Sequence, residues 1–257
     1  MPALSFAHYP SLAGRVVLVT GGASGIGADI VRAFAANAAR IAFLDILEKE
    51  GNTLAAELAG SAHAPLFLAC DLVDIEATRA AIATVREQLG PVAVLVNNAA
   101  NDDRHAIAEV TVDYWDRTQE LNLRHQFFCA QAVHPHMKEL GHGAIVNLSS
   151  IAWRGGAAQM PAYATAKAGV VGLTRALANA FGPDNIRVNA IEPGAVMTDR
   201  QRRLWFKDEE SIAAMVARQA IPRVLLGEEI ARTALFLAAD DSAMITKQSI
   251  TVDAGLR

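Results

Sequence analysis

The sequence predicts an α/β protein with a single doubly wound domain built on a seven-stranded parallel sheet. The 257 residues are 52% hydrophobic but only 6% aromatic and 19% charged, a composition that suits small-residue helices packed on a buried sheet. Short apolar runs of strand length alternate with longer segments of helical period. No linker-like stretch interrupts this alternation. We therefore expect residues 1–257 to form one domain.

Each predicted strand is a short apolar run bounded by turn residues or charges. The strands are predicted over Arg15–Thr20, Arg40–Asp45, Leu66–Cys70, Val92–Asn97, Ala144–Leu148, Arg187–Ile191 and Ser249–Val252. Helices are predicted over Gly25–Ala36, Leu47–Leu58, Asp74–Leu89, Val112–Leu140 (long enough for two pieces), Pro161–Phe181 and Glu228–Ala239. Residues 198–219 interrupt the alternation of strands and helices with a charged run and an amphipathic stretch. Such an insertion suits a lid over a binding site.

The charge balance and the number of cysteines indicate which binding partners and which cellular compartment to expect. Asp plus Glu (27) outnumber Lys plus Arg (23), so neither nucleic acid nor an anionic membrane is an expected partner. Residues 1–10 lack the pattern of a signal peptide, and the apolar runs elsewhere fall short of the roughly 20 residues of a membrane span. The two cysteines are too few for a disulfide framework. We expect a soluble, cytoplasmic protein.

A glycine-rich turn follows the first predicted strand. The run from Thr20 to Gly27 reads TGGASGIG and leads directly into a helical pattern. Glycines allow a tight turn and let backbone N–H groups approach a pyrophosphate, and the start of the helix adds a partial positive charge. A glycine-rich turn without a ligand is the alternative, and its position between a strand and a helix makes that alternative weaker.

Asp45 ends the second predicted strand, where a carboxylate can accept hydrogen bonds from the adenosine ribose hydroxyls. The same carboxylate would repel a 2′-phosphate. Neither Ser24 nor Ile46 offers the basic side chain that usually neutralises such a phosphate. We therefore expect NAD, rather than NADP, as the cofactor, although a simple strand-end turn is the alternative role for Asp45.

Tyr163 and Lys167 lie four residues apart in a helical stretch and therefore on one helix face. A phenol is a weak base at neutral pH because its pKa is about 10. A nearby ammonium stabilises the phenolate and lowers that pKa. The pair predicts a proton-transfer site.

The TGxxxGxG spacing, Asn97-Asn98-Ala99, the Tyr163/Lys167 pair and Pro193-Gly194 followed by Thr198 together resemble the short-chain dehydrogenase/reductase family. Ala100 departs from the glycine usual there. The resemblance implies a Rossmann-type fold and a homotetramer. It also implies catalytic roles for Asn122, Ser150, Tyr163 and Lys167. The cofactor-binding residues it implies are Gly21, Ser24, Gly25, Ile26, Gly27, Asp45, Asp71, Leu72, Asn98, Ala99, Tyr163, Lys167, Pro193, Gly194, Val196 and Thr198.

The polar loop Asn101–His105 follows the fourth predicted strand, at the sheet edge where ligands of doubly wound folds bind. This loop and the string NLRHQFF resemble bacterial aldose 1-dehydrogenases that act on pentoses and 6-deoxyhexoses such as L-fucose, D-arabinose and D-xylose. That resemblance implies oxidation of a sugar at C1 to the lactone, with Tyr163 as general base. The candidate substrate-binding residues are Asn101, Asp102, Arg104, Ser150, Trp153 and Glu192.

Two other functions remain open from the sequence. A 3-ketoacyl-carrier or hydroxysteroid oxidoreductase of the same family would share these motifs, although the polar loop argues against an apolar pocket. A non-catalytic dinucleotide-binding sensor would keep the glycines but could lose the four catalytic residues. The histidines show no ligand set at metal spacing, so no metal is expected.

Overall fold

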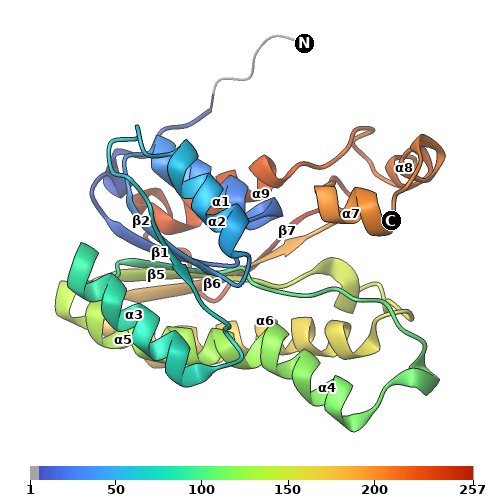
Figure 1. Cartoon of the computed structure of the whole chain (residues 1–257), viewed down its shortest axis with the longest axis horizontal. Helices are drawn as coiled ribbons and strands as arrows, with labels where there is room; N and C mark the ends of the chain where they lie inside the picture. The colour runs from blue at the N-terminus through green and yellow to red at the C-terminus, as the bar shows by residue number, and fades with distance from the viewer. Residues whose placement is uncertain (1–5, 257) are drawn as a thin grey trace.

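All seven predicted strands lie in one parallel sheet, which runs through the middle of the molecule (Figure 1). The structure is a computed structural model that describes residues 6–256. The strand order is β3-β2-β1-β4-β5-β6-β7, so the prediction of a doubly wound sheet is confirmed. The strands are β1 (Val16–Thr20), β2 (Arg40–Asp45), β3 (Leu66–Ala69), β4 (Val94–Asn97), β5 (Gly143–Leu148), β6 (Ile186–Pro193) and β7 (Ser249–Val252).

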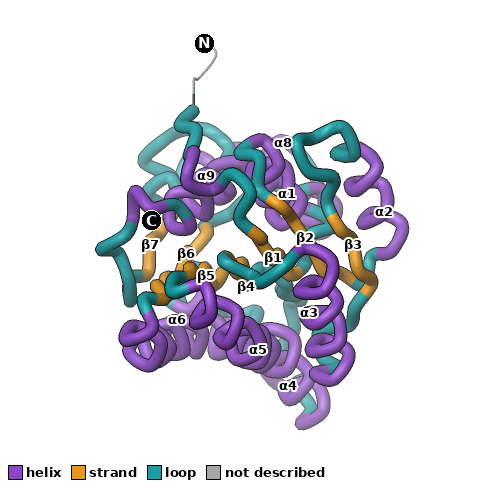
Figure 2. The backbone as a smooth tube through the Cα atoms, turned by 90° about the vertical axis from the view of Figure 1, so that its left-hand side faces the viewer, coloured by secondary structure: helices purple, strands orange, loops and turns teal. Residues whose placement is uncertain are grey.

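Helices cover both faces of the sheet, with α1, α2 and α9 on one face and α3, α5 and α6 on the other (Figure 2). These helices lie close to their predicted bounds, and α1 and α6 match them at both ends. They are α1 (Gly25–Ala36), α2 (Glu48–Glu57), α3 (Ile75–Leu89), α5 (His125–Leu140), α6 (Pro161–Phe181) and α9 (Gly227–Ala238).

The central strands are buried on both faces, which explains why they appear in the sequence as continuous apolar runs. Every residue of β1 is buried. Val17 and Val19 face the core under α1 and α9, whereas Leu18 packs in a second core under α3, α5 and α6. Burial of these side chains on both sides keeps the strand ends, and hence the turns that follow them, in place.

The long fourth predicted helix consists of two pieces joined by a wider turn. Helix α4 (Val112–Gln119) continues through a π-helical turn, Glu120–Arg124, into α5. Such turns inside a helix occur frequently at functional sites. Asn122, one of the candidate catalytic residues, lies in this turn and is buried.

Residues 198–219 contain two short helices that the sequence pattern did not predict as helices, α7 (Asp199–Leu204) and α8 (Glu209–Val216). Both lie beside one end of the sheet (Figure 1). Met197, Ile212 and Met215 form a small apolar cluster separate from the two cores against the sheet. A separate cluster is compatible with a lid, and movement of this segment stays a prediction.

The strand order reverses direction between β1 and β4, which are neighbours in the sheet. In open parallel sheets, the crevice at the carboxyl ends of such strands is where ligands bind. Within residues 6–256, no helix is both long enough and apolar enough to cross a bilayer.

Candidate active site

In the glycine turn between β1 and α1, the backbone packs so closely around Gly21 and Gly27 that a side chain at either position would clash. A Cβ on Gly27 would lie 1.8 Å from the Gly21 carbonyl oxygen, and one on Gly21 would lie 2.7 Å from Ala99 Cα. Gly21 and Gly25 also have φ angles of +65° and +52°, a backbone conformation that favours glycine. The turn therefore forms a cradle of bare backbone, which fits a pyrophosphate group.

The start of α1 is left without a side-chain cap. Ser24 occupies the N-cap position but makes no capping hydrogen bond with its hydroxyl. The first N–H groups of a helix attract anions, and a cap would compete with a ligand for them. Together with the glycine cradle, this end of α1 can hold the phosphates of a dinucleotide.

Asp45 supports this turn from the end of β2. Its Oδ2 accepts a hydrogen bond from the Ala23 N–H at 2.9 Å, and its Oδ1 accepts one from the Leu47 N–H at 3.0 Å. The carboxylate is therefore held beside the turn, and only 8% of the residue is exposed. Asp71 follows the neighbouring β3, where its side chain accepts from the Val73 N–H and is exposed at the same sheet edge.

Thr20, which opens the glycine-rich run but received no role from the sequence, joins the ends of β1 and β4. Its hydroxyl accepts hydrogen bonds from the N–H groups of Asn98 and Ala99 at 3.0 and 3.2 Å. The Asn98 amide donates to the carbonyls of Thr20 and Gly21. Asn98 therefore holds the glycine turn in shape. A polar residue at the end of a buried strand was the signal that could have identified Thr20.

The segment after β6 reaches the glycine turn from the other side. A Cβ on Gly25 would lie 3.4 Å from the Thr198 Cγ2, so these two distant motifs meet at one place. Thr198 caps α7 by accepting from the Gln201 N–H at 3.3 Å. The Met197 N–H donates to the Leu225 carbonyl at 2.8 Å, which attaches this segment to the chain before α9.

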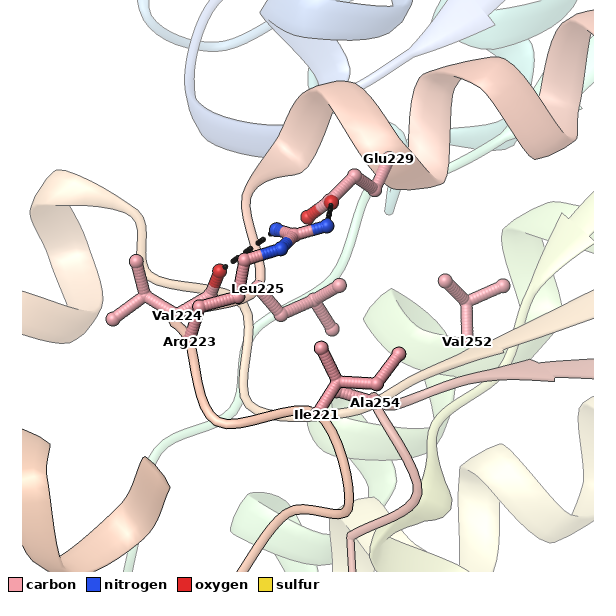
Figure 3. A pocket seen from close by; sticks show the side chains of 7 residues that line it. All are labelled: Ile221, Arg223, Val224, Leu225, Glu229, Val252 and Ala254. Carbon is pink, nitrogen blue, oxygen red and sulfur yellow. Dashed lines mark hydrogen bonds and ion pairs between the residues drawn. The ribbon is translucent and has the colours of Figure 1, made fainter. Parts of the chain in front are cut away.

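A small pocket lies behind that attachment, lined by residues 221–225 and by the ends of α9 and β7 (Figure 3). Arg223 forms an ion pair with Glu229 across it. None of the candidate catalytic residues lines this pocket. This pocket is therefore separate from the site that the candidate catalytic residues form.

The catalytic pair lies on α6, against the end of β5. The Lys167 ammonium donates to the Leu148 carbonyl at 2.8 Å and lies 5.5 Å from the centre of the Tyr163 ring. The Ser149 hydroxyl donates to the Lys167 carbonyl at 2.7 Å, so Ser149 serves the backbone. The adjacent Ser150 interacts with the Tyr163 phenol. The structure thus brings Ser150, Tyr163 and Lys167 together.

The pKa of the Tyr163 phenol is raised in the folded chain, whereas the sequence predicted a lowered pKa. Burial raises the pKa of Tyr163, the Asp102 carboxylate raises it further, and the hydrogen bond with Ser150 lowers it in part. The lowered pKa expected from the sequence is wrong for the chain alone, because burial, the largest effect, disfavours the phenolate. Burial also lowers the pKa of Lys167, to about 7, against the opposing effect of Asp102.

Asn122 contacts the polar loop from the π-helical turn between α4 and α5. Its Oδ1 accepts from the Asn101 N–H at 2.9 Å, and its amide donates to the Thr118 carbonyl at 3.0 Å. His125, in the next turn, is also fully buried, and burial lowers its pKa to about 3, with Lys167 lowering it further. His125 is therefore neutral at physiological pH. The sequence did not single it out.

Two of the candidate substrate residues have partners inside the protein. Glu192, a candidate substrate-binding residue, is fully buried. Its carboxylate accepts hydrogen bonds from Arg154, at 3.1 Å for Nη2, and from the Ser249 hydroxyl. The Arg154 guanidinium also lies 5.1 Å from the centre of the Trp153 ring. Glu192 and Arg154 thus connect the segment after Ser150 to β6.

Three further substrate candidates, Asn101, Asp102 and Arg104, lie in the loop after β4, which contacts α7. Arg200 pairs with Asp102 and Asp103, and Arg104 stacks over the Trp205 ring at 4.1 Å. The Asn101 N–H donates to Asn122 Oδ1 at 2.9 Å, which joins the loop to a candidate catalytic residue, and the Asp102 carboxylate raises the pKa of both Tyr163 and Lys167. Nothing in the sequence pattern linked Arg200 to this loop. Within residues 6–256, no cluster of three or more His, Cys, Asp or Glu could hold a metal ion.

Comparisons with known proteins give consistent matches over nearly the whole chain. A family described as "Enoyl-(Acyl carrier protein) reductase" matches residues 21–257. The chain is 51% identical to "Probable galactose dehydrogenase GalD" of Rhizobium meliloti (strain 1021), over 98% of this chain and 99% of that protein. It is 47% identical to "D-xylose 1-dehydrogenase" of Caulobacter vibrioides (strain NA1000 / CB15N), over 99% and 100%.

Among solved structures, a variant of actinorhodin polyketide ketoreductase with NADPH is similar, with a TM-score of 0.87 and 32% identity. The match covers 94% of this chain and 97% of the ketoreductase. Sequence, fold and site geometry agree with these matches. The chain belongs to the short-chain dehydrogenase/reductase family and is an oxidoreductase enzyme.

Proposed function

We propose that this enzyme oxidises an aldose sugar at C1 to the lactone, with NAD as the hydride acceptor. A pentose or a 6-deoxyhexose such as L-fucose, D-arabinose or D-xylose is the first substrate class to test. The observation that carries the proposal is the contact of the polar loop Asn101–His105 with the catalytic residues: the Asn101 N–H donates to Asn122 Oδ1 at 2.9 Å, and Asp102 raises the pKa of Tyr163. The two relatives named for galactose and D-xylose support it.

The proposed reaction removes one proton and one hydride from the sugar. Tyr163, as phenolate, takes the proton of the anomeric hydroxyl, while the Ser150 hydroxyl orients that oxygen. NAD, when bound, supplies a cationic ring that accepts the hydride leaving C1. Loss of the proton and the hydride leaves a carbon–oxygen double bond at C1, which is the lactone carbonyl. In the proposed relay, Lys167 passes the proton away from Tyr163 to a water that Asn122 holds, and from there to solvent.

An assay of substrates tests the class directly. We expect reduced cofactor to accumulate, as absorbance at its nicotinamide band, with at least one aldose among D-xylose, D-arabinose, L-fucose and D-galactose. The product should be the corresponding lactone. A hydroxyacyl thioester or a hydroxysteroid that reacts when every aldose fails would refute the sugar proposal in favour of the alternative oxidoreductase classes.

We propose NAD, rather than NADP, because the Asp45 carboxylate is held beside the glycine turn. Two basic side chains, Arg32 and Lys49, line a pocket next to Ala23. Arg32 is engaged there by Glu57 through bonds of 2.8 and 2.9 Å. In this proposal, the Asp45 carboxylate is the charge that a 2′-phosphate bound beside the turn would face, and it would repel that phosphate.

Asp45→Ala should weaken the preference for NAD. Repulsion between two unit charges about 4 Å apart is worth about 1 kcal/mol even in water, so the ratio of kcat/KM for NAD to that for NADP should fall at least about fivefold. Glu87→Ala serves as the control, since it removes one negative charge from an exposed position of α3 that does not line this pocket. Equal kcat/KM for the two cofactors in the parent enzyme would show that Asp45 does not select NAD.

A further inference from the structure

Loop Asn101–His105 and helix α7 are far apart in the sequence but bound to each other in the fold. The Arg200 guanidinium donates from Nε to Asp102 Oδ1 at 3.1 Å. Its Nη2 donates to Asn101 Oδ1 and to Asp103 Oδ1, both at 2.7 Å. One planar group thus bonds three consecutive loop residues, a geometry that the rigid fork of arginine provides and lysine does not.

Two neighbours of Arg200 extend this contact along the loop. The Gln201 amide donates to Asp102 Oδ2 at 2.5 Å. The Arg104 guanidinium lies 4.1 Å from the centre of the Trp205 ring, just after the end of α7. Because contacts run from Asn101 to Arg104, α7 holds the whole loop and not a single side chain.

The loop held in this way adjoins the reacting groups. The Asn101 N–H donates to Asn122 Oδ1 at 2.9 Å, and Asn122 is buried in the π-helical turn. The Asp102 carboxylate raises the pKa of Tyr163, after the larger effect of burial. A shift of the loop would therefore move both a hydrogen-bond partner of Asn122 and a negative charge beside Tyr163.

Asp102 keeps capacity for a ligand after these contacts. Each of its oxygens accepts one bond from α7, whereas an ionised carboxylate can accept about four. Its side chain is 22% exposed. A carboxylate held rigidly with one free position on each oxygen suits two neighbouring hydroxyls of a sugar ring.

We propose that Arg200 is a specificity-determining positioning residue, which holds Asn101 and Asp102 in place as one wall of the sugar site. The proposal rests on the proposed sugar oxidation for the identity of the ligand. In this proposal, α7 acts through the loop and does not itself contact the reacting carbon of the sugar. It orders the loop before the sugar arrives, so less ordering entropy opposes binding.

Arg200→Ala and Arg200→Lys test the proposal, with Arg203→Ala as the control for loss of one positive charge from an exposed position of α7. For Arg200→Ala we expect the KM for the best sugar to rise about tenfold or more, as for loss of charged hydrogen bonds. The Kd for NAD should stay within about twofold. Arg200→Lys should recover only part of the loss, since it restores the charge but not the fork.

Hydrogen exchange of amides 101–105 in the cofactor-free protein provides a readout that does not need a substrate. In Arg200→Ala these amides should exchange about tenfold faster or more, because the bonds that hold the loop are lost. Arg203→Ala should leave their exchange at the parental rate. Combining Arg200→Ala with Asp102→Ala should raise KM by less than the product of the single effects, because both remove the same contact.

Unchanged loop exchange in Arg200→Ala would overturn the proposal, as would faster exchange with unchanged KM for every sugar. If the parent enzyme oxidises no aldose, the proposed function fails. The exchange measurement then still decides separately whether Arg200 holds the loop.

Discussion

Tyr163→Phe should lower kcat at least about a hundredfold, which is the low end for lost general acid–base catalysis. The substitution removes only the phenol oxygen from a buried side chain, so the packing of α6 is kept and cofactor binding should change little. Steady-state kinetics with the best aldose and a separate titration of the nucleotide separate the two effects. Tyr9→Phe, which removes a phenol oxygen before β1, is the matched control.

The pH dependence of the parent enzyme gives a second measure of the same group. Burial and Asp102 raise the pKa of Tyr163, so the phenol is protonated at neutral pH in the chain alone. The base form therefore increases as pH rises, and kcat/KM for oxidation should increase with pH above neutral. Tyr163→Phe should abolish this limb. A variant with near-parental turnover and the same pH profile would remove Tyr163 from the role of base.

Gly27→Ala should lower kcat/KM by about a hundredfold or more, the size of loss expected when reacting groups are misplaced by about 1 Å. The new Cβ would lie 1.8 Å from the Gly21 carbonyl oxygen and 2.6 Å from the Asn98 amide nitrogen. Because both neighbours shape the phosphate cradle, the turn must open to accept the methyl group. The Kd for the nucleotide, measured by titration, should rise together with the loss of kcat/KM.

Gly60→Ala is the matched control for this substitution. An added Cβ there meets nothing within 4 Å. The same change of one methyl group should leave kinetics unaltered and, by restricting the unfolded chain, stabilise the protein by up to about 1 kcal/mol. Unimpaired nucleotide binding by Gly27→Ala would show that the glycine turn does not form the phosphate site.

Part of the site could be predicted because it depends on local geometry. Helical spacing alone places Tyr163 and Lys167 on one face of α6. The glycine turn is similarly local, since the strand, the turn and the helix follow one another along the chain. The alternation of apolar runs and helical segments predicted seven strands, because central parallel strands are buried on both sides.

The remaining features depend on contacts between distant segments, which no local pattern encodes. Arg200 and Asp102 are 98 residues apart, and only the packing of α7 beside the loop after β4 brings them together. The sequence likewise presented Glu192 as a candidate substrate-binding residue, whereas the fold buries it with Arg154 and Ser249 as partners.

The direction of the Tyr163 pKa shift also depends on contacts between distant segments, whereas the pairing of Tyr163 with Lys167 depends on local spacing. The fold class, the glycine cradle and the pairing of Tyr163 with Lys167 could be predicted from local patterns, because spacing along a strand or helix sets each of these. The burial of the phenol beside Asp102 and the contact of α7 with the loop became visible in the folded chain. Desolvation and charge pairing depend on which distant segments meet, and folding alone determines that.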